Sequence, residues 1–160
     1  MMKRLAFGVL ALLLVTGSAS AATASGSGAL ALAAIVAGYS PSVTARERGA
    51  MNRLFAGRLN FSYPANRTIS IKADAIVCRA GNVDITAWSC ELTFGKKKKK
   101  LKGRRAHELY AAIAEAGVPP DGAAGSSFEA LSHLDCSINP DVIKQKAGGG
   151  ATCNFDPGQP

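Results

Sequence analysis

Four cysteines constrain the fold of this chain more than any other feature, because each disulfide holds two backbone segments at a short, fixed distance. An even number of cysteines in an exported chain is typical of disulfides. The chain has no Cys-x-x-Cys spacing, which argues against a zinc site and against redox catalysis. We therefore predict two disulfides, no metal site and no cofactor. The cysteines are Cys78, Cys90, Cys136 and Cys153.

The start of the chain predicts the export that such disulfides require. A charged beginning, Met1–Arg4, precedes an apolar stretch from Leu5 to Thr16, and Ala19-Ser20-Ala21 then offers a cleavage signal. The apolar stretch is shorter than the ~20 residues of a membrane-spanning helix. We predict that residues 1–21 are a signal peptide, which leaves a soluble periplasmic or extracellular protein without a transmembrane segment.

The 139 residues that follow the leader match the size of a single domain. Small residues dominate 22–42, so we expect this segment to be a flexible, Ala-rich lead. Its apolar part, 29–38, is expected to form a short buried helix or to lie on the core. We assign 43–157 to one α+β domain.

Capping patterns and helical spacing predict three helices. The sequence Thr44–Glu47 matches a capping box, and Gly57 is a plausible helix end. A second helix is expected over 104–116, where apolar residues recur at helical spacing. A second capping box at Ser126–Glu129 predicts a short third helix. Its buried side would carry Phe128, Leu131 and Leu134.

Alternating apolar residues over 69–77 predict a strand, and a second strand is expected from Val83 to Phe94. Gly81-Asn82 suits a two-residue hairpin turn. In that register Ile69, Ile71, Ala73, Ala75 and Val77 share the inner face. The aromatic residues Trp88, Phe94 and Tyr110 are then expected in the core.

This hairpin register has a consequence for the disulfides. It places Cys78 and Cys90 on opposite faces and roughly 16 Å apart, whereas bridged Cα atoms lie within about 7 Å. We therefore predict that each of them joins Cys136 or Cys153. The sequential pairing, Cys78 with Cys90 and Cys136 with Cys153, remains open if the turn is wider than two residues.

The order of the elements predicts an α+β fold. Short strands are expected near Ile138, at 142–143 and over 151–155. Together with the central hairpin over 68–94, they would form a small antiparallel sheet. The helices would pack on one face of this sheet, and two disulfides would stabilise it.

The basic residues of the mature chain are concentrated in one segment. The whole chain carries a formal net charge of +8, but without the leader and the eight basic residues of 96–105 the charge is −2. Adjacent lysines repel one another, so the segment must lie in water, as an exposed loop or as an edge strand. The basic residues are Lys96, Lys97, Lys98, Lys99, Lys100, Lys102, Arg104 and Arg105.

Two interpretations of this basic segment compete. Lysines on an edge strand protect a sheet from pairing with another sheet. Alternatively, the segment contacts an anionic partner, such as a glycan, a lipid headgroup or an acidic protein. Nucleic acid is the least favoured partner, because the segment lacks interleaved aromatic residues that stack on bases.

No motif in the chain predicts catalysis. His107 is expected on the surface of its helix, and His133 has neither an acidic partner nor a nucleophile motif beside it. We therefore predict an exported, disulfide-stabilised, non-enzymatic binding module. The alternative is a secreted inhibitor or stress-related scaffold that acts through the loop 119–125, and a hydrolase without a recognisable motif ranks third.

Overall fold

The computed structural model describes residues 21–79, 85–117, 128–146 and 149–157. They form an antiparallel sheet of six strands in the order β1-β6-β5-β2-β3-β4. Its strands are β1 (Ala22–Ser25), β2 (Ile69–Arg79), β3 (Ser89–Phe94), β4 (Lys97–Lys102), β5 (Phe128–Ile138) and β6 (Ala151–Pro157). The helices are α1 (Ser27–Ala37), α2 (Ala45–Phe55), α3 (Arg104–Glu115), α4 (Pro140–Gln145) and the short 3-10 helix η1 (Ile85–Ala87).

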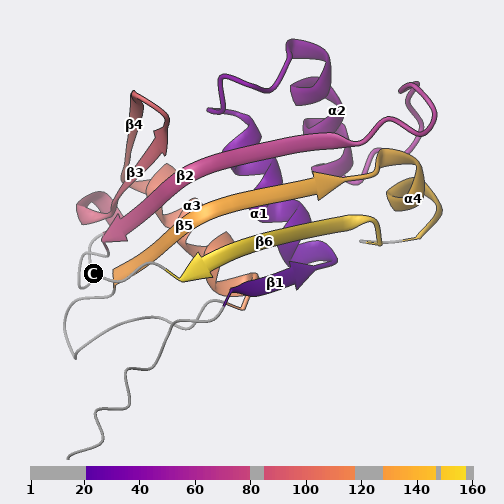
Figure 1. Cartoon of the computed structure of the whole chain (residues 1–160). Helices are drawn as coiled ribbons and strands as arrows, with labels where there is room; N and C mark the ends of the chain where they lie inside the picture. Colours follow the sequence, from indigo (N-terminus) through magenta and orange to yellow (C-terminus); the bar gives the residue numbers. More distant parts are fainter. Residues whose placement is uncertain (1–20, 80–84, 118–127, 147–148, 158–160) are drawn as a thin grey trace, which may run out of the picture.

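The predicted α+β class is confirmed. Figure 1 shows α1 and α3 behind the sheet, on the same face. Among the described residues, no helix is both long enough and apolar enough to cross a membrane. The predicted signal peptide falls almost wholly on residues 1–20, which lie outside the described part of the chain.

The capping signals at α2 are confirmed. The Glu47 N–H donates to Thr44 Oγ1 at 3.2 Å, and the Thr44 N–H donates to Glu47 Oε2 at 2.9 Å. This second hydrogen bond is the largest cause of a lowered pKa for Glu47. At the other end, Gly57 has a φ of 70°, which suits glycine just beyond a helix.

The segment 22–42, predicted as a flexible lead, belongs to the fold. β1 pairs with β6, and α1 is buried along most of its length, as expected for 29–38. A Cβ atom on Gly28 would lie 2.7 Å from the carbonyl oxygen of Glu115, so α1 passes close to the end of α3. Small residues, which predict flexibility in the sequence, here allow close packing.

The register of β2 against β3 corrects the predicted hairpin. Cys78 lies directly opposite Cys90. Residues 80–88 separate the two strands, so β3 begins later than the predicted Val83. The observed register differs from the one predicted from a two-residue turn at Gly81-Asn82, and these two residues themselves lie outside the described part of the chain. The prediction that the two cysteines occupy opposite faces is therefore wrong.

Both disulfides link neighbouring strands. Cys78–Cys90 joins β2 to β3 and Cys136–Cys153 joins β5 to β6, each with Cα atoms 4.0 Å apart. A short Cα separation is typical of opposed residues that do not exchange backbone hydrogen bonds. The expectation of two disulfides is confirmed, but the predicted pairing of Cys78 and Cys90 with Cys136 and Cys153 is wrong. The sequential pairing, which a wider turn allows, is the one present. All four cysteines are buried in the core.

The short helix predicted over Phe128–Leu134 is wrong, because this segment begins β5. Leu131 and Leu134 are both buried, three residues apart as in a helix. The spacing arises at His133, where φ is 53° and the pairing with β6 shifts by one residue. Such a bulge moves the following side chain to the other face. The proposed helix cap, Ser126, lies outside the described residues.

β2 changes face at the corresponding place. Ala73 and Ile76 are both buried, whereas Ala75 and Val77, predicted for the inner face, are only half-buried. The predicted inner face therefore holds only for the first half of β2, and from Ile76 onward the alternation continues in the opposite phase.

The strand predicted at 142–143 is also wrong, because α4 occupies this place. The Asn139 side chain accepts hydrogen bonds from the N–H groups of Asp141 and Val142, at 3.1 and 3.3 Å. Pro140, which suits the first turn of a helix, follows directly. The strand expected over 151–155 is confirmed as β6.

Candidate anion-binding site at one edge of the sheet

β4 lies at the free edge of the sheet, beside β3. The residues from Lys96 to Lys100 and Lys102 are exposed, whereas Leu101 is buried. Of the two predicted placements of this segment, the edge strand is confirmed. The other two predicted residues, Arg104 and Arg105, begin α3 and are also exposed.

The backbone of β4 presents every second residue to the free edge. Phe94 and Lys97 pair across a two-residue turn, and the closing pair of such a hairpin exchanges backbone hydrogen bonds. In the same phase, the Gly103 N–H donates to the carbonyl oxygen of Trp88 at 2.9 Å. The alternate residues of β4 therefore direct their N–H and C=O groups away from the sheet. These residues are Lys98, Lys100 and Lys102.

Lys102 belongs to a row of polar side chains that crosses three strands. Arg79 on β2 lies opposite Ser89 on β3, and Ser89 lies opposite Lys102 on β4. Directly opposed residues have Cβ atoms about 5 Å apart. A guanidinium, a hydroxyl and an ammonium group therefore share the sheet face that points away from the helices. We call Arg79, Ser89 and Lys102 the cationic row.

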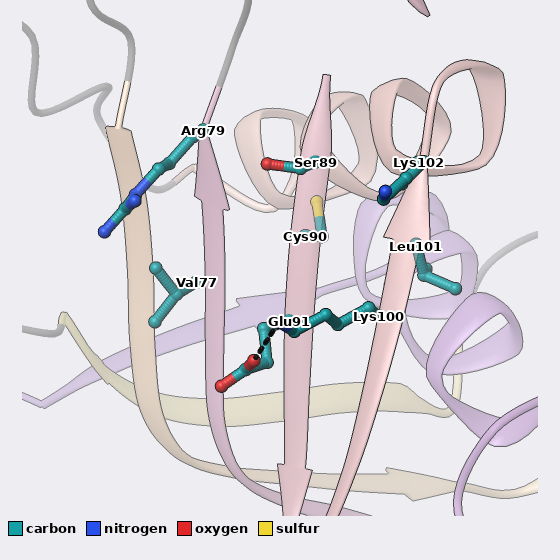
Figure 2. Close-up of a pocket in the computed structure, with 8 residues that line it drawn as sticks. All are labelled: Val77, Arg79, Ser89, Cys90, Glu91, Lys100, Leu101 and Lys102. Carbon is teal, nitrogen blue, oxygen red and sulfur yellow. Dashed lines mark ion pairs between the residues drawn. The ribbon is translucent and has the colours of Figure 1, made fainter. Parts of the chain in front are cut away.

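A cavity of about 480 Å³ is lined by the cationic row and by the next row, which contains Val77, Glu91 and Lys100. Figure 2 shows both rows on β2, β3 and β4, with Lys100 extending from β4 to Glu91 on β3. The lining thus contains three cationic side chains and one carboxylate. Its chemistry suits a ligand with negative charge and hydrogen-bond acceptors.

Glu91 is the counter-ion of this region. Its carboxylate accepts a hydrogen bond from Lys98 Nζ at 2.7 Å and lies 3.8 Å from Lys100 Nζ. The hydrogen bond from Lys98 is the largest cause of a lowered pKa for Glu91, and the charges of Lys98, Lys100 and Arg79 lower it further. One carboxylate is therefore shared by two lysines, and positive charge remains in excess.

The same positions at the opposite end of the sheet carry only hydroxyl groups. Ser137 on β5 lies opposite Thr152 on β6, and Thr152 lies opposite Ser25 on β1. Thr152 directly precedes the disulfide cysteine of β6, as Ser89 precedes that of β3. We call these three residues the hydroxyl row. This strand arrangement therefore does not require cations at such positions.

The first turn of α3 adds positive charge to the end of β4. Arg104 and Arg105 occupy this turn, which contains no acidic residue, and Gly103 provides no side-chain cap. Cations at a helix N-terminus are electrostatically unfavourable, because the unpaired N–H groups there are partly positive. Arg104 is partly compensated by Glu108, whose carboxylate lies 3.0 Å from its Nε.

Neither histidine lines the cavity. His107 is half-buried rather than fully on the surface, because its ring contacts Trp88 edge to face at 4.7 Å between centroids. Trp88 also contacts Tyr110, at 4.6 Å. These two aromatic residues and Phe94 pack on the core but are only partly buried. His133 is exposed in the bulge of β5.

Sequence reasoning missed Arg79 and Ser89. A two-residue turn places Arg79 at the tip of the hairpin, far from the lysines, and this error followed from the wrong register. Pairing Cys78 with Cys90 would have aligned Arg79, Ser89 and Lys102 correctly. The loop 119–125, the candidate for an inhibitor, lies outside the described residues.

No group of three or more metal-ligating side chains is found in the described part of the chain. Comparisons with protein-family models, with curated proteins and with solved structures found no match. The features that bear on function are the geometry of the β4 edge and the contrast between the cationic row and the hydroxyl row.

Proposed function

We propose that this protein is an exported, non-enzymatic binding module that contacts an anionic partner through β4, the start of α3 and the cationic row. The observation that carries the proposal is the contrast between the two rows. Equivalent positions hold Ser137, Thr152 and Ser25 at one end of the sheet, and two cations at the other. Since the fold does not need these cations, a partner is the simplest reason for them.

Export is supported by the covalent framework and by the predicted leader. Two disulfides persist in an oxidising compartment, and cytosolic thiols are kept reduced. The described fold begins at β1, directly after the predicted cleavage position at Ala21.

Edge protection alone explains less than the structure contains. Charged side chains on β4 would be enough to discourage pairing with another sheet. Arg79, however, lies two strands inside the edge, and Arg104 and Arg105 lie beyond the strand. A single function in anion attraction accounts for all of these positions.

The test is retention of the mature protein on a matrix that carries sulfate groups, eluted with increasing salt. We expect a variant with Lys96–Lys100 changed to Ser to elute well before the wild type. A second variant, with Arg79→Ser and Lys102→Ser, converts the cationic row into a copy of the hydroxyl row and should also elute early. Attraction of exposed charges fades above ~0.15 M salt, where the Debye length is about 8 Å.

A matched control removes the same number of charges as the lysine variant from other exposed positions. Its changes to Ser are at Arg46, Arg58, Arg67, Lys72 and Lys146. The control should elute close to the wild type. If it elutes as early as the lysine variant, retention reflects net charge alone and the proposed site is wrong. The converse variant, Ser25→Lys with Ser137→Arg, should increase retention by creating a second cationic row.

A further inference from the structure

We infer that the β4 edge accepts an extended acidic polypeptide segment as a seventh strand of the sheet. The inference rests on the proposed function and specifies its partner as an acidic protein. The backbone and the side chains of β4 both support this choice, and they do so independently.

The backbone of β4 has hydrogen-bonding groups that a further strand could pair with. Lys98, Lys100 and Lys102 direct their N–H and C=O groups away from β3, and no strand covers that side within the described residues. A peptide strand offers matching donors and acceptors at the spacing of β4. A sulfated glycan or a lipid headgroup offers acceptors for the ammonium groups, but not the paired donors and acceptors of a backbone at the spacing of a β-strand.

The charges of β4 determine which kind of strand can pair with its free edge. Within the described residues, Lys97, Lys99 and Lys102 have no ion-pair partner, and Lys98 and Lys100 share only Glu91. A second copy of β4 would place lysines opposite lysines, and like charges directly opposed across strands are unfavourable. A strand with acidic side chains places opposite charges at the same positions.

The other edge of the sheet provides an internal control. The Gly26 N–H donates to the carbonyl oxygen of Ala151 at 3.1 Å, so the backbone groups of Gly26 point toward β6. Because this direction alternates along the strand, the N–H and C=O groups of Thr23 and Ser25 point outward, away from the sheet. This edge is uncharged. An acidic strand should therefore add to β4 and not to β1.

The experiment uses an eight-residue peptide of alternating Glu and Thr and two methylated forms of it. One form carries N-methyl groups on the second, fourth and sixth residues, which blocks one edge of the peptide strand. The other carries the same number of groups on the fourth, fifth and sixth residues, which blocks both edges. Charge and composition are identical in the two forms. We expect the first form to retain the affinity of the unmodified peptide and the second to bind about tenfold more weakly.

Amide hydrogen exchange supplies the second measurement. The unmodified peptide should slow exchange at Lys98, Lys100 and Lys102 by about tenfold, and leave Thr23 and Ser25 unchanged. Equal binding of the two methylated forms, or equal protection along β4, would overturn strand addition. If all peptides then still required Lys96–Lys100, the proposed function would stand without this inference. If the wild type bound no peptide and no sulfated matrix, both would fail.

A pair of protein variants separates backbone from charge. Lys100→Thr and Lys100→Pro remove the same charge, but only proline removes the outward N–H group. Because this N–H has no partner in the sheet, proline is tolerated at such an edge position. We expect Lys100→Pro to weaken peptide binding severalfold more than Lys100→Thr. Equal affinities of the two variants, with native unfolding transitions in both, would contradict the inference.

Discussion

The two ends of the sheet are built alike but carry different side chains. β1 leads through Gly26 into α1, and β4 leads through Gly103 into α3. Both glycines combine a positive φ with a strongly negative ψ, 76° and −146° for Gly26 and 60° and −135° for Gly103. Essentially only glycine adopts this conformation. The two helices then meet on one face, where Gly28 lies against the end of α3.

The disulfides repeat the same design. Each lies in the strand next to an edge and bridges it to the adjoining inner strand. Cys153 Sγ lies 3.4 Å from the carbonyl oxygen of Ala29, the third residue of α1. Cys90 Sγ lies 3.3 Å from that of Ala106, the third residue of α3. The comparison separates what the fold needs from what one end adds: glycine, disulfide and helix are shared, and the cations are not.

The largest expected effect tests whether the disulfides are equivalent. Changing Cys78 and Cys90 to Ala, or Cys136 and Cys153 to Ala, should each lower the free energy of unfolding by about 3 kcal/mol. The sequence separations of 12 and 17 residues are similar, so chain entropy predicts nearly equal losses. Denaturant unfolding of both variants measures this. A large loss in one and none in the other would show that the two ends are not equivalent.

The next effect concerns the two glycines that join strand to helix. Gly26→Ala and Gly103→Ala should each lower the free energy of unfolding by about 1–3 kcal/mol, because alanine is strained at these dihedral angles. Gly49→Ala is the control. Gly49 lies inside α2, where a Cβ atom would meet only Arg53 Nη2 at 3.8 Å, so alanine should stabilise the protein by up to about 1 kcal/mol. A loss at Gly49 equal to that at Gly103 would refute the conformational explanation.

The parts of the fold that the sequence predicts well are those formed by interactions between residues close together in the sequence. The capping box of Thr44 and Glu47 depends on hydrogen bonds within one turn, and the helix after Gly103 shows apolar residues at helical spacing. Both can therefore be recognised without knowledge of the tertiary structure. The bulge at His133 is different. It places Leu131 and Leu134 on one face at helical spacing, and only the pairing with β2 and β6 identifies the segment as a strand.

The candidate site was predictable only in part for the same reason. The exposure of the β4 lysines can be predicted from the sequence, because adjacent charges cannot be buried. Arg79 and Ser89 join them through the register of β2 against β3, which apolar alternation alone does not determine. The similarity between the two ends of the sheet could not be predicted from the sequence either. β5 and β6 come late in the chain and β1 comes first, so the shared features do not recur in sequence order.

A smaller effect on stability, but a visible one on association, is expected at the edges. Changing Lys97, Lys98, Lys99 and Lys100 to Thr would leave Lys102 as the single charged residue of β4, which would then be nearly as neutral as β1, but longer. Threonine favours strands and no longer repels a second copy, so we expect association to rise with concentration. Sedimentation velocity measures this. The same four positions changed to Glu reverse the sign of the charge, so two copies still repel each other and should not associate; association of both variants would mean that charge does not protect this edge.

The smallest expected effect concerns Glu91, whose equivalent on β6 is the neutral Asn154. The pKa of Glu91 lies below the ordinary value of 4.5, chiefly because Lys98 donates a hydrogen bond to its ionised form. A lowered pKa in the folded protein means that the ionised carboxylate stabilises the fold above about pH 4.5, and that this contribution is lost as the pH falls through the folded pKa. Glu91→Gln should therefore be slightly less stable than the wild type at neutral pH, and the difference should disappear in acid.

Because Lys98 and Lys100 lose their shared counter-ion, the same variant should bind a sulfated matrix more strongly. Unfolding at several pH values and an NMR titration of the Glu91 carboxyl measure the first effect, and salt elution measures the second. Weaker retention of Glu91→Gln would show that Glu91 orients the lysines for their partner and does not merely neutralise them.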